Sequence, residues 1–195
     1  MEHQDVWGTT EIENAFTSSG ALLSGHFELR SGLHSDRFFQ CAMALRFPDV
    51  AEQLCRALAR RVMDANLGTI NAVIAPALGG LVVGHEMARA LGVMSIFAEK
   101  SEGMLAMRRF QIEKGKRYLV AEDVVTRGGR VQETIDLVRA GGGVVVGIAV
   151  LVDRSAGAAT FDVPLVSLQQ MAPQVWEPAA CPMCQVGGTA VHPGS

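Results

Sequence analysis

The sequence predicts an α/β domain built around a mostly parallel sheet. From residue 72 onward, short runs rich in Val and Ile alternate with segments of helical periodicity. These runs lack the polar alternation of a sheet with one solvated face, which indicates strands covered on both faces. Strands separated by helices in this way form parallel sheets, and 195 residues suffice for a single domain with its own core.

The expected strands of this sheet cover residues 72–75, 94–98, 117–121, 144–152 and 164–168, and helices are expected at 79–92 and 130–142. An earlier helix is predicted over 48–68, where Asp49 and Glu52 resemble a capping box and Gly68 provides a stop. Its apolar stripe consists of Val50, Leu54, Ala57, Leu58 and Val62.

The segments outside this core are predicted to form a smaller N-terminal part (about 1–45) and a C-terminal tail (about 171–195), with the core at about 46–170. Residues 9–24 have helical periodicity with Ile12, Ala15 and Leu22–Leu23 facing inward, and residues 24–39 indicate two short strands with turns. Residues 100–116 carry charge and little periodicity, which predicts a long loop or an exposed hairpin.

Composition argues against several classes of function. A net charge of -3 and a pI near 5.9 disfavour a nucleic-acid partner. No apolar run approaches the roughly 20 residues of a membrane span, and the N-terminus is acidic and polar, so we expect a cytoplasmic protein without a membrane partner. Four cysteines are too few for a disulfide scaffold at this length, and Cys41 and Cys55 are expected to be buried thiols.

The strongest candidate site follows the strand expected at 117–121. Glu122 and Asp123 come directly after this strand, and Gly128 and Gly129 then open a helix. A glycine turn at a helix N-terminus suits a phosphate, whereas two adjacent carboxylates suit ribose hydroxyls or a magnesium ion. The alternative is that the acids are solvated and the glycines only permit a turn. Neither a Rossmann nor a Walker A motif is present.

This order of parts closely resembles the signature of type I phosphoribosyltransferases: an apolar strand, two acids, two apolar residues, then Thr-x-Gly-Gly. The resemblance implies the fold of that family, with a small N-terminal hood and a mobile catalytic loop. It also implies that the two acids contact the ribose hydroxyls of phosphoribosyl pyrophosphate (PRPP), that Asp123 takes part in catalysis, and that the following loop binds the 5-phosphate. The implied contacts are Glu122, Asp123, Val124, Val125, Thr126, Arg127, Gly128, Gly129 and Arg130.

One further segment of the core matches this family, and two residues of the 5-phosphate loop depart from it. The segment "APALGG" at 75–80 resembles the family's pyrophosphate loop, so Ala77, Leu78 and Gly79 are expected to bind PRPP, with Mg²⁺ held mainly through the substrate. By itself this segment could equally be a structural turn. Arg127 and Arg130 depart from the pattern, because the family usually carries small residues there, a Ser or Thr in the second case.

The sequence of the N-terminal part indicates which base the enzyme would use. Phe27, Leu29, Arg30, Ser31, Gly32, Ser35, Phe38 and Phe39 match the hood pattern of orotate phosphoribosyltransferases. The resemblance implies that orotate is bound by Arg30, Phe38, Phe39 and Thr126, and that Arg154 in "VDRS" binds its carboxylate. A planar anion does need an apolar wall and a cationic clamp. Core packing is the alternative for at least one of the two Phe.

The loop at 100–116 contains Lys100, Arg108 and Arg109, which the resemblance makes candidate catalytic cations. Family members close this loop over the site, often that of a neighbouring subunit, so a homodimer with a loop shared across the interface is implied. The loop sequence departs from the best-known orotate enzymes, which carry several lysines and an Asp-His-Gly. A solvated basic hairpin is the alternative.

The C-terminal Cys181 and Cys184 form a lone CxxC, which is half a zinc site. Only His192 lies close to it in sequence, and His26, His34 and His85 are interpreted as polar residues of turns or helices. No side-chain metal ligand is therefore assigned.

Taken together, the resemblance implies an enzyme that converts orotate and PRPP to orotidine 5'-monophosphate and pyrophosphate in de novo pyrimidine synthesis. The alternatives are a phosphoribosyltransferase for another base and a non-catalytic regulator that binds PRPP on the same fold.

Overall fold

The computed structural model describes residues 6–29 and 31–193. Its centre is a six-stranded sheet in the order β5-β4-β3-β6-β7-β8. The strands are β3 (Ala72–Pro76), β4 (Met94–Ser101), β5 (Met104–Ala106), β6 (Arg117–Val125), β7 (Val144–Asp153) and β8 (Leu165–Gln170). All neighbours are parallel except β5, which pairs antiparallel with β4.

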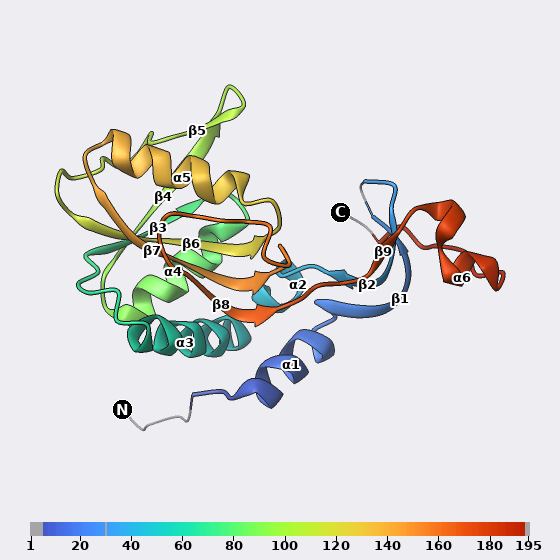
Figure 1. Ribbon diagram of the computed structural model, residues 1–195. Coiled ribbons are helices and arrows are strands. Elements are labelled where there is room, and N and C mark those ends of the chain that lie inside the picture. Colours follow the sequence, from blue (N-terminus) through green and yellow to red (C-terminus); the bar gives the residue numbers. More distant parts are fainter. Residues whose placement is uncertain (1–5, 30, 194–195) are drawn as a thin grey trace.

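Helices cover both faces of this sheet (Figure 1). Helices α3 (Pro48–Asp64) and α4 (Gly80–Leu91) lie on one face, and α5 (Gly129–Ala140) lies on the other. Successive strand residues point to opposite faces, so Val73 and Leu119 join the core under α3 and α4, whereas Ile74 and Val120 join the core under α5. The predicted α/β fold with a mostly parallel sheet is confirmed.

A smaller sheet, beside the core in Figure 1, joins the two ends of the chain. Strands β1 (Leu22–Glu28) and β2 (His34–Phe39) form an antiparallel hairpin, and β9 (Val175–Trp176) pairs with the free edge of β2. Helix α1 (Thr9–Ser18) precedes this hairpin, α2 (Ala42–Leu45) leads into the core, and η1 (Pro178–Ala180) and α6 (Pro182–Gln185) complete the tail. The division into hood, core and tail stays a prediction.

The structure corrects several predicted boundaries. Helix α1 ends at Ser18, so Leu22 and Leu23 lie in β1 and do not face inward from a helix. Helix α3 has Phe47 as its N-cap, Pro48 in its first turn and no capping bond from a side chain, so the predicted capping box is wrong. That helix also ends at Asp64, before Gly68.

Residues 100–116 include a hairpin, which is one of the two predicted forms. Strands β4 and β5 pair from Glu99 to Ala106 around a turn at Glu102 and Gly103, both with positive φ. The hairpin rests against α5, where the Glu133 carboxylate accepts a hydrogen bond from the Leu105 N–H. Across the described ranges, the structure contains no helix with the length and apolar character to cross a membrane.

Candidate active site

A cavity of about 450 Å³ lies at the carboxyl ends of β3 and β6, and we call it the acidic cavity. In open α/β sheets this edge is where ligands bind. All twelve residues predicted to contact PRPP line the cavity, together with Pro76 and Val131. The twelve are Ala77, Leu78, Gly79, Glu122, Asp123, Val124, Val125, Thr126, Arg127, Gly128, Gly129 and Arg130.

The loop after β3 approaches the two acids closely because it contains glycines. A Cβ on Gly79 would lie 3.2 Å from Asp123 Oδ1, and a Cβ on Gly80 would lie 2.9 Å from Glu122 Oε1. The Ala77–Leu78 peptide is cis, and the Ala77 N–H donates to the Ala98 carbonyl on β4 at 2.8 Å. A side chain at either glycine would push the loop away from the acids. The glycines therefore allow the loop after β3 and the end of β6 to approach each other across the cavity.

The two acids are part of strand β6, which corrects the prediction that the strand ends at residue 121. The strand continues to Val125 because Val124 and Val125 pair with Val152 and Asp153 of β7. Glu122 is only 6% exposed, and Asp123 is partly buried. The Asp123 N–H donates to Glu122 Oε1 at 3.1 Å, and the Val124 N–H donates to Asp123 Oδ1 at 2.8 Å.

Burial makes the charged forms of this acid pair costly. It raises the pKa of Glu122 from its ordinary 4.5 to about 8, and the neighbouring Asp123 charge adds to the rise while Arg130 opposes it. Burial also raises the pKa of Asp123, although hydrogen bonds that its carboxylate accepts counteract this. A cation or hydroxyl donors placed in the cavity would stabilise the carboxylates that burial destabilises.

This raised pKa predicts a pH-dependent effect of Glu122→Gln on stability. The unfolded chain loses this proton near pH 4.5 and the folded chain near pH 8, so Glu122 lowers stability progressively as the pH rises through that interval. We expect the variant to gain on the order of 2 kcal/mol in free energy of unfolding above pH 8 and little near pH 5. Urea unfolding at both pH values measures this. Equal gains at both pH values, or a similar gain for exposed Glu13→Gln, would contradict it.

The turn between β6 and α5 forms the other end of the acidic cavity. Gly128 has a φ of 79° and a Cβ there would lie 2.7 Å from the Phe161 ring, so glycine is required by conformation and by space. The first turn of α5 offers free N–H groups to an anion. Arg130 lies in that turn, and its positive charge lowers the pKa of Glu122, so it contributes positive potential to the acidic cavity. Arg127 is exposed, and nothing in the structure explains it.

A second cavity of about 530 Å³ lies between the hood and the core, and we call it the aromatic cavity. Phe38, Phe39, Thr126 and Arg154 line it, as predicted for orotate contacts. Arg30, the fifth predicted contact, lies outside the described residues. Phe39 is buried and packs edge-to-face on Phe16 at 5.0 Å, so the core alternative applies to it, whereas Phe38 is only partly buried.

Arg154 is the cationic group of the aromatic cavity. Its backbone N–H donates to the Val125 carbonyl at 2.8 Å, which fixes its position at the end of β7. Burial lowers the pKa of its guanidinium, and its buried Nε has no hydrogen-bond partner in the described part of the chain. A buried donor without a partner is unfavourable, so an anionic ligand would stabilise this side chain.

Thr126 lines both cavities, so they adjoin at the end of β6. One side of this junction offers carboxylates and glycine loops, and the other offers an aromatic wall and an unpaired arginine. A sugar phosphate and a planar anion could therefore occupy adjacent sites at one strand end.

Comparisons with known proteins agree with this geometry. A family model described as a phosphoribosyl transferase domain matches residues 49–182. An orotate phosphoribosyltransferase from Pelotomaculum thermopropionicum is 50% identical and one from Desulforamulus reducens 47%, each over 95% of this chain and 96% of the relative. The crystal structure of an orotate phosphoribosyltransferase from Aeropyrum pernix matches with a TM-score of 0.68 and 30% identity, over 81% of this chain and 93% of that one. This chain belongs to the orotate phosphoribosyltransferase family.

The three cations predicted for the catalytic loop line neither the acidic nor the aromatic cavity. Lys100, Arg108 and Arg109 are exposed on or after the β4–β5 hairpin, and none is among the described lining residues. Arg109 instead forms an ion pair with Glu99, with Nε to Oε2 at 3.0 Å and Nη2 to Oε1 at 3.3 Å. Within this chain, the structure therefore separates the predicted catalytic cations from Asp123.

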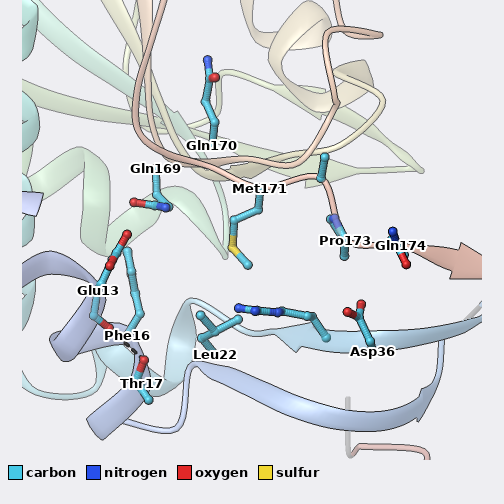
Figure 2. Close-up of a pocket in the computed structure, with 12 residues that line it drawn as sticks. Glu13, Phe16, Thr17, Leu22, Asp36, Gln169, Gln170, Met171, Pro173 and Gln174 are labelled. Carbon is cyan, nitrogen blue, oxygen red and sulfur yellow. Dashed lines mark hydrogen bonds between the residues drawn. The ribbon is translucent and has the colours of Figure 1, made fainter. Parts of the chain in front are cut away.

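A larger cavity of about 580 Å³ lies between α1, β2 and the segment that follows β8 (Figure 2). Figure 2 shows Glu13 and Phe16 of α1 on one side and Gln169 on the other, with Met171 extending between the walls. Its lining includes none of the residues predicted to bind substrate, so the volume of a cavity alone does not identify the candidate site.

The sequence did not point to several residues that line the aromatic cavity. His192 and Pro193, from the predicted tail, line the aromatic cavity with Glu28, Leu29, Ser31 and Gln40. The hood pattern contained Leu29 and Ser31, without a contact assigned to either, and it adjoined Glu28 and Gln40. No local signal connects the tail to this cavity. His192 also lies apart from the cysteines with which its sequence position had associated it.

Proposed function

We propose that this chain transfers the phosphoribosyl group of PRPP to orotate, forming orotidine 5'-monophosphate and pyrophosphate as a step of de novo pyrimidine synthesis. The observation that carries the proposal is the junction of the acidic and aromatic cavities at Thr126. PRPP in the first cavity and orotate in the second would place the sugar beside the base. Positioning of this kind is a major source of rate enhancement.

In the acidic cavity, the carboxylates of Glu122 and Asp123 accept hydrogen bonds from the ribose hydroxyls. The backbone amides of residues 126–130 bind the 5-phosphate, and those of 77–79 bind the pyrophosphate. We include Mg²⁺, held mainly through the substrate; a cation beside the acid pair would also stabilise the carboxylates whose pKa values burial raises. When bound, this ion neutralises charge on the departing pyrophosphate.

In the aromatic cavity, Arg154 binds the orotate carboxylate and Phe38 contacts the flat face of the ring. The bond from the sugar C1 to the pyrophosphate oxygen breaks, and a bond from C1 to an orotate ring nitrogen forms on the opposite face. Orotate is easily deprotonated at that nitrogen, so the protein needs no strong base. Its own contribution is alignment, together with carboxylates placed near the positive charge that develops on the sugar.

Lys100, Arg108 and Arg109 complete this proposal as cations of a closing loop. Arg109 must leave Glu99 to reach pyrophosphate, and an exposed ion pair of this kind costs little to break. We propose that the loop closes over the site of a second subunit in a homodimer, and that the protein acts in the cytoplasm. Loop closure would exclude water from the activated sugar.

A panel assay tests the function. The chain is incubated with Mg²⁺, PRPP and one of orotate, uracil, adenine or hypoxanthine, and loss of each base is followed. We expect turnover of orotate alone. Turnover of a purine in its place would indicate another phosphoribosyltransferase, and PRPP binding without turnover of any base would indicate a regulator.

The Arg130→Ser variant tests how the unusual 5-phosphate loop binds its anion. Because Arg130 contributes positive potential to the acidic cavity, we expect its loss to raise the KM for PRPP by about tenfold, the value of one charge-assisted hydrogen bond. The KM for orotate should change little. Arg127→Ser, which removes an arginine from the same loop, is the matched control and should leave the KM for PRPP nearly unchanged. An unchanged or lower KM for PRPP in Arg130→Ser would show that the amides alone bind the phosphate.

A further inference from the structure

Four residues that could ligate a metal meet where the tail crosses the hood, and none of them lines the acidic or the aromatic cavity. They are His26 on β1, His34 at the start of β2, and Cys181 and Cys184 at the start and within α6. The ligand atoms all lie within 4.8 Å of one another. The sequence alone had assigned the two histidines to turns or helices, and the structure corrects this by placing both on facing strands.

The distances between these atoms approach those of a tetrahedral site. His26 Nε2 lies 2.9 Å from His34 Nδ1, 3.4 Å from Cys181 Sγ and 3.6 Å from Cys184 Sγ. Cys184 Sγ lies 3.3 Å from His34 Nδ1. Tetrahedral zinc with bonds of roughly 2.0–2.1 Å to nitrogen and 2.3 Å to sulfur separates its ligand atoms by about 3.3–3.8 Å. Small shifts would therefore bring all four ligands into place.

Hydrogen bonds alone do not explain this convergence. An imidazole nitrogen carries either one proton or one lone pair, yet His26 Nε2 has three polar neighbours at close range. The other ring nitrogen of His26 is buried without a hydrogen-bond partner among the described residues. Cys181 is fully buried and His34 is 8% exposed, so these groups are withdrawn from water as well. A shared cation satisfies all four atoms at once.

The surrounding backbone holds the tail against the hood on both sides of the cluster. Strand β9 pairs with β2, where Trp176 lies opposite His34. Beyond α6, the Val191 N–H donates to the His26 carbonyl at 2.8 Å, and the Glu28 N–H donates to the Val191 carbonyl at 2.9 Å. A Cβ on Gly188 would lie 2.7 Å from the Met183 carbonyl, so the chain turns tightly there. A tail segment therefore pairs with each edge of the hairpin: β9 with β2, and Val191 with β1.

We propose that His26, His34, Cys181 and Cys184 bind one structural Zn²⁺ ion that fastens the C-terminal tail to the N-terminal hairpin. Two thiolates and two imidazoles in a closed tetrahedral set favour zinc over harder cations, and four protein ligands leave no open position for catalysis. The ion would also fix the segment that brings His192 and Pro193 to the aromatic cavity.

Metal analysis of the full chain, purified under reducing conditions without a polyhistidine tag, tests the site directly. We expect one zinc per chain, and loss of that zinc in Cys181→Ser and in His34→Gln. The matched controls are Cys55→Ala, which removes a core thiol of α3, and His85→Gln, which removes an exposed imidazole of α4. Both controls should keep the metal. A zinc-free chain after reconstitution with excess zinc, or full zinc content in Cys181→Ser, would overturn the proposal.

A second measurement avoids the variants, which could fail to fold. The unmodified chain is stripped with a chelator and titrated with Co²⁺, and we expect the intense visible bands of tetrahedral cobalt with thiolate charge transfer. A lower Tm of the stripped chain, restored by zinc, should accompany this. Weak octahedral cobalt bands would contradict the site. So would an isolated chain that holds a Cys181–Cys184 disulfide and no zinc.

Discussion

Replacing Asp123 with Asn is expected to lower kcat/KM for PRPP by about 100- to 1,000-fold. The substitution keeps the side-chain oxygen that accepts the Val124 N–H at 2.8 Å, so the local fold should persist. In the proposed complex, it removes the negative charge that accepts hydrogen bonds from the ribose hydroxyls and that lies beside the charge developing on the sugar. Each charge-assisted hydrogen bond is worth roughly 1.5–3 kcal/mol, and the transition state adds to this.

Steady-state kinetics with varied PRPP and saturating orotate measures the effect. The matched control is Asp136→Asn on α5, where Asp136 accepts an exposed bond from Gln132 at 2.9 Å. Circular dichroism of both variants monitors the fold. If Asp123→Asn behaved like its control, the acid pair would not be the ribose contact that we propose.

Replacing Arg154 with Ala is expected to raise the KM for orotate by about 100-fold, because it removes a bidentate charged contact worth roughly 2–3 kcal/mol. The side chain has a buried Nε without a described partner, so its removal breaks no described side-chain bond. Affinity for PRPP alone should change little. Arg154→Lys should recover only part of the loss, since an ammonium cannot grip a carboxylate with two parallel bonds.

Exposed Arg37, which lines the cavity of about 580 Å³, provides the comparison for Arg154. Arg37→Ala should leave the KM for orotate unchanged. A large effect of Arg37→Ala, together with none from Arg154→Ala, would move the orotate site to the cavity of Figure 2.

The core sheet could be predicted from the sequence because each buried strand is a short apolar run. The predicted ends of strands and helices were wrong where pairing with a distant strand outweighs the local sequence pattern. Glu122 and Asp123 look like the start of a loop, yet β6 continues through them because β7 supplies hydrogen-bond partners up to Asp153. Leu22 and Leu23 extend a helical pattern, yet they pair with Phe39 and Phe38 in the hairpin. Periodicity contains no information about such partners.

The candidate sites likewise include residues that the sequence indicates and residues that it does not. The predicted PRPP contacts lie at two strand ends, where a motif and a general rule about parallel sheets indicate the same edge. The cluster of two histidines and two cysteines joins positions more than 140 residues apart in sequence, for example Cys184 and His34. Its only sequence signals were the CxxC and two histidines on either side of a predicted turn. Nothing local indicates that the tail returns to that hairpin.

The pairing of β6 with β7 has a consequence for how this family could change its substrate. Val125 pairs with Asp153, and its carbonyl accepts the Arg154 N–H at 2.8 Å, so backbone bonds join the end of β6 at the acidic cavity to Arg154 in the aromatic cavity. Neighbouring strands keep a spacing of about 4.8 Å whatever their side chains are. In the proposed complex, the separation of sugar and base is therefore set by the sheet, whereas Arg154 and the hood select the base. Replacing those side chains could select another base while the attacking nitrogen still meets the same carbon.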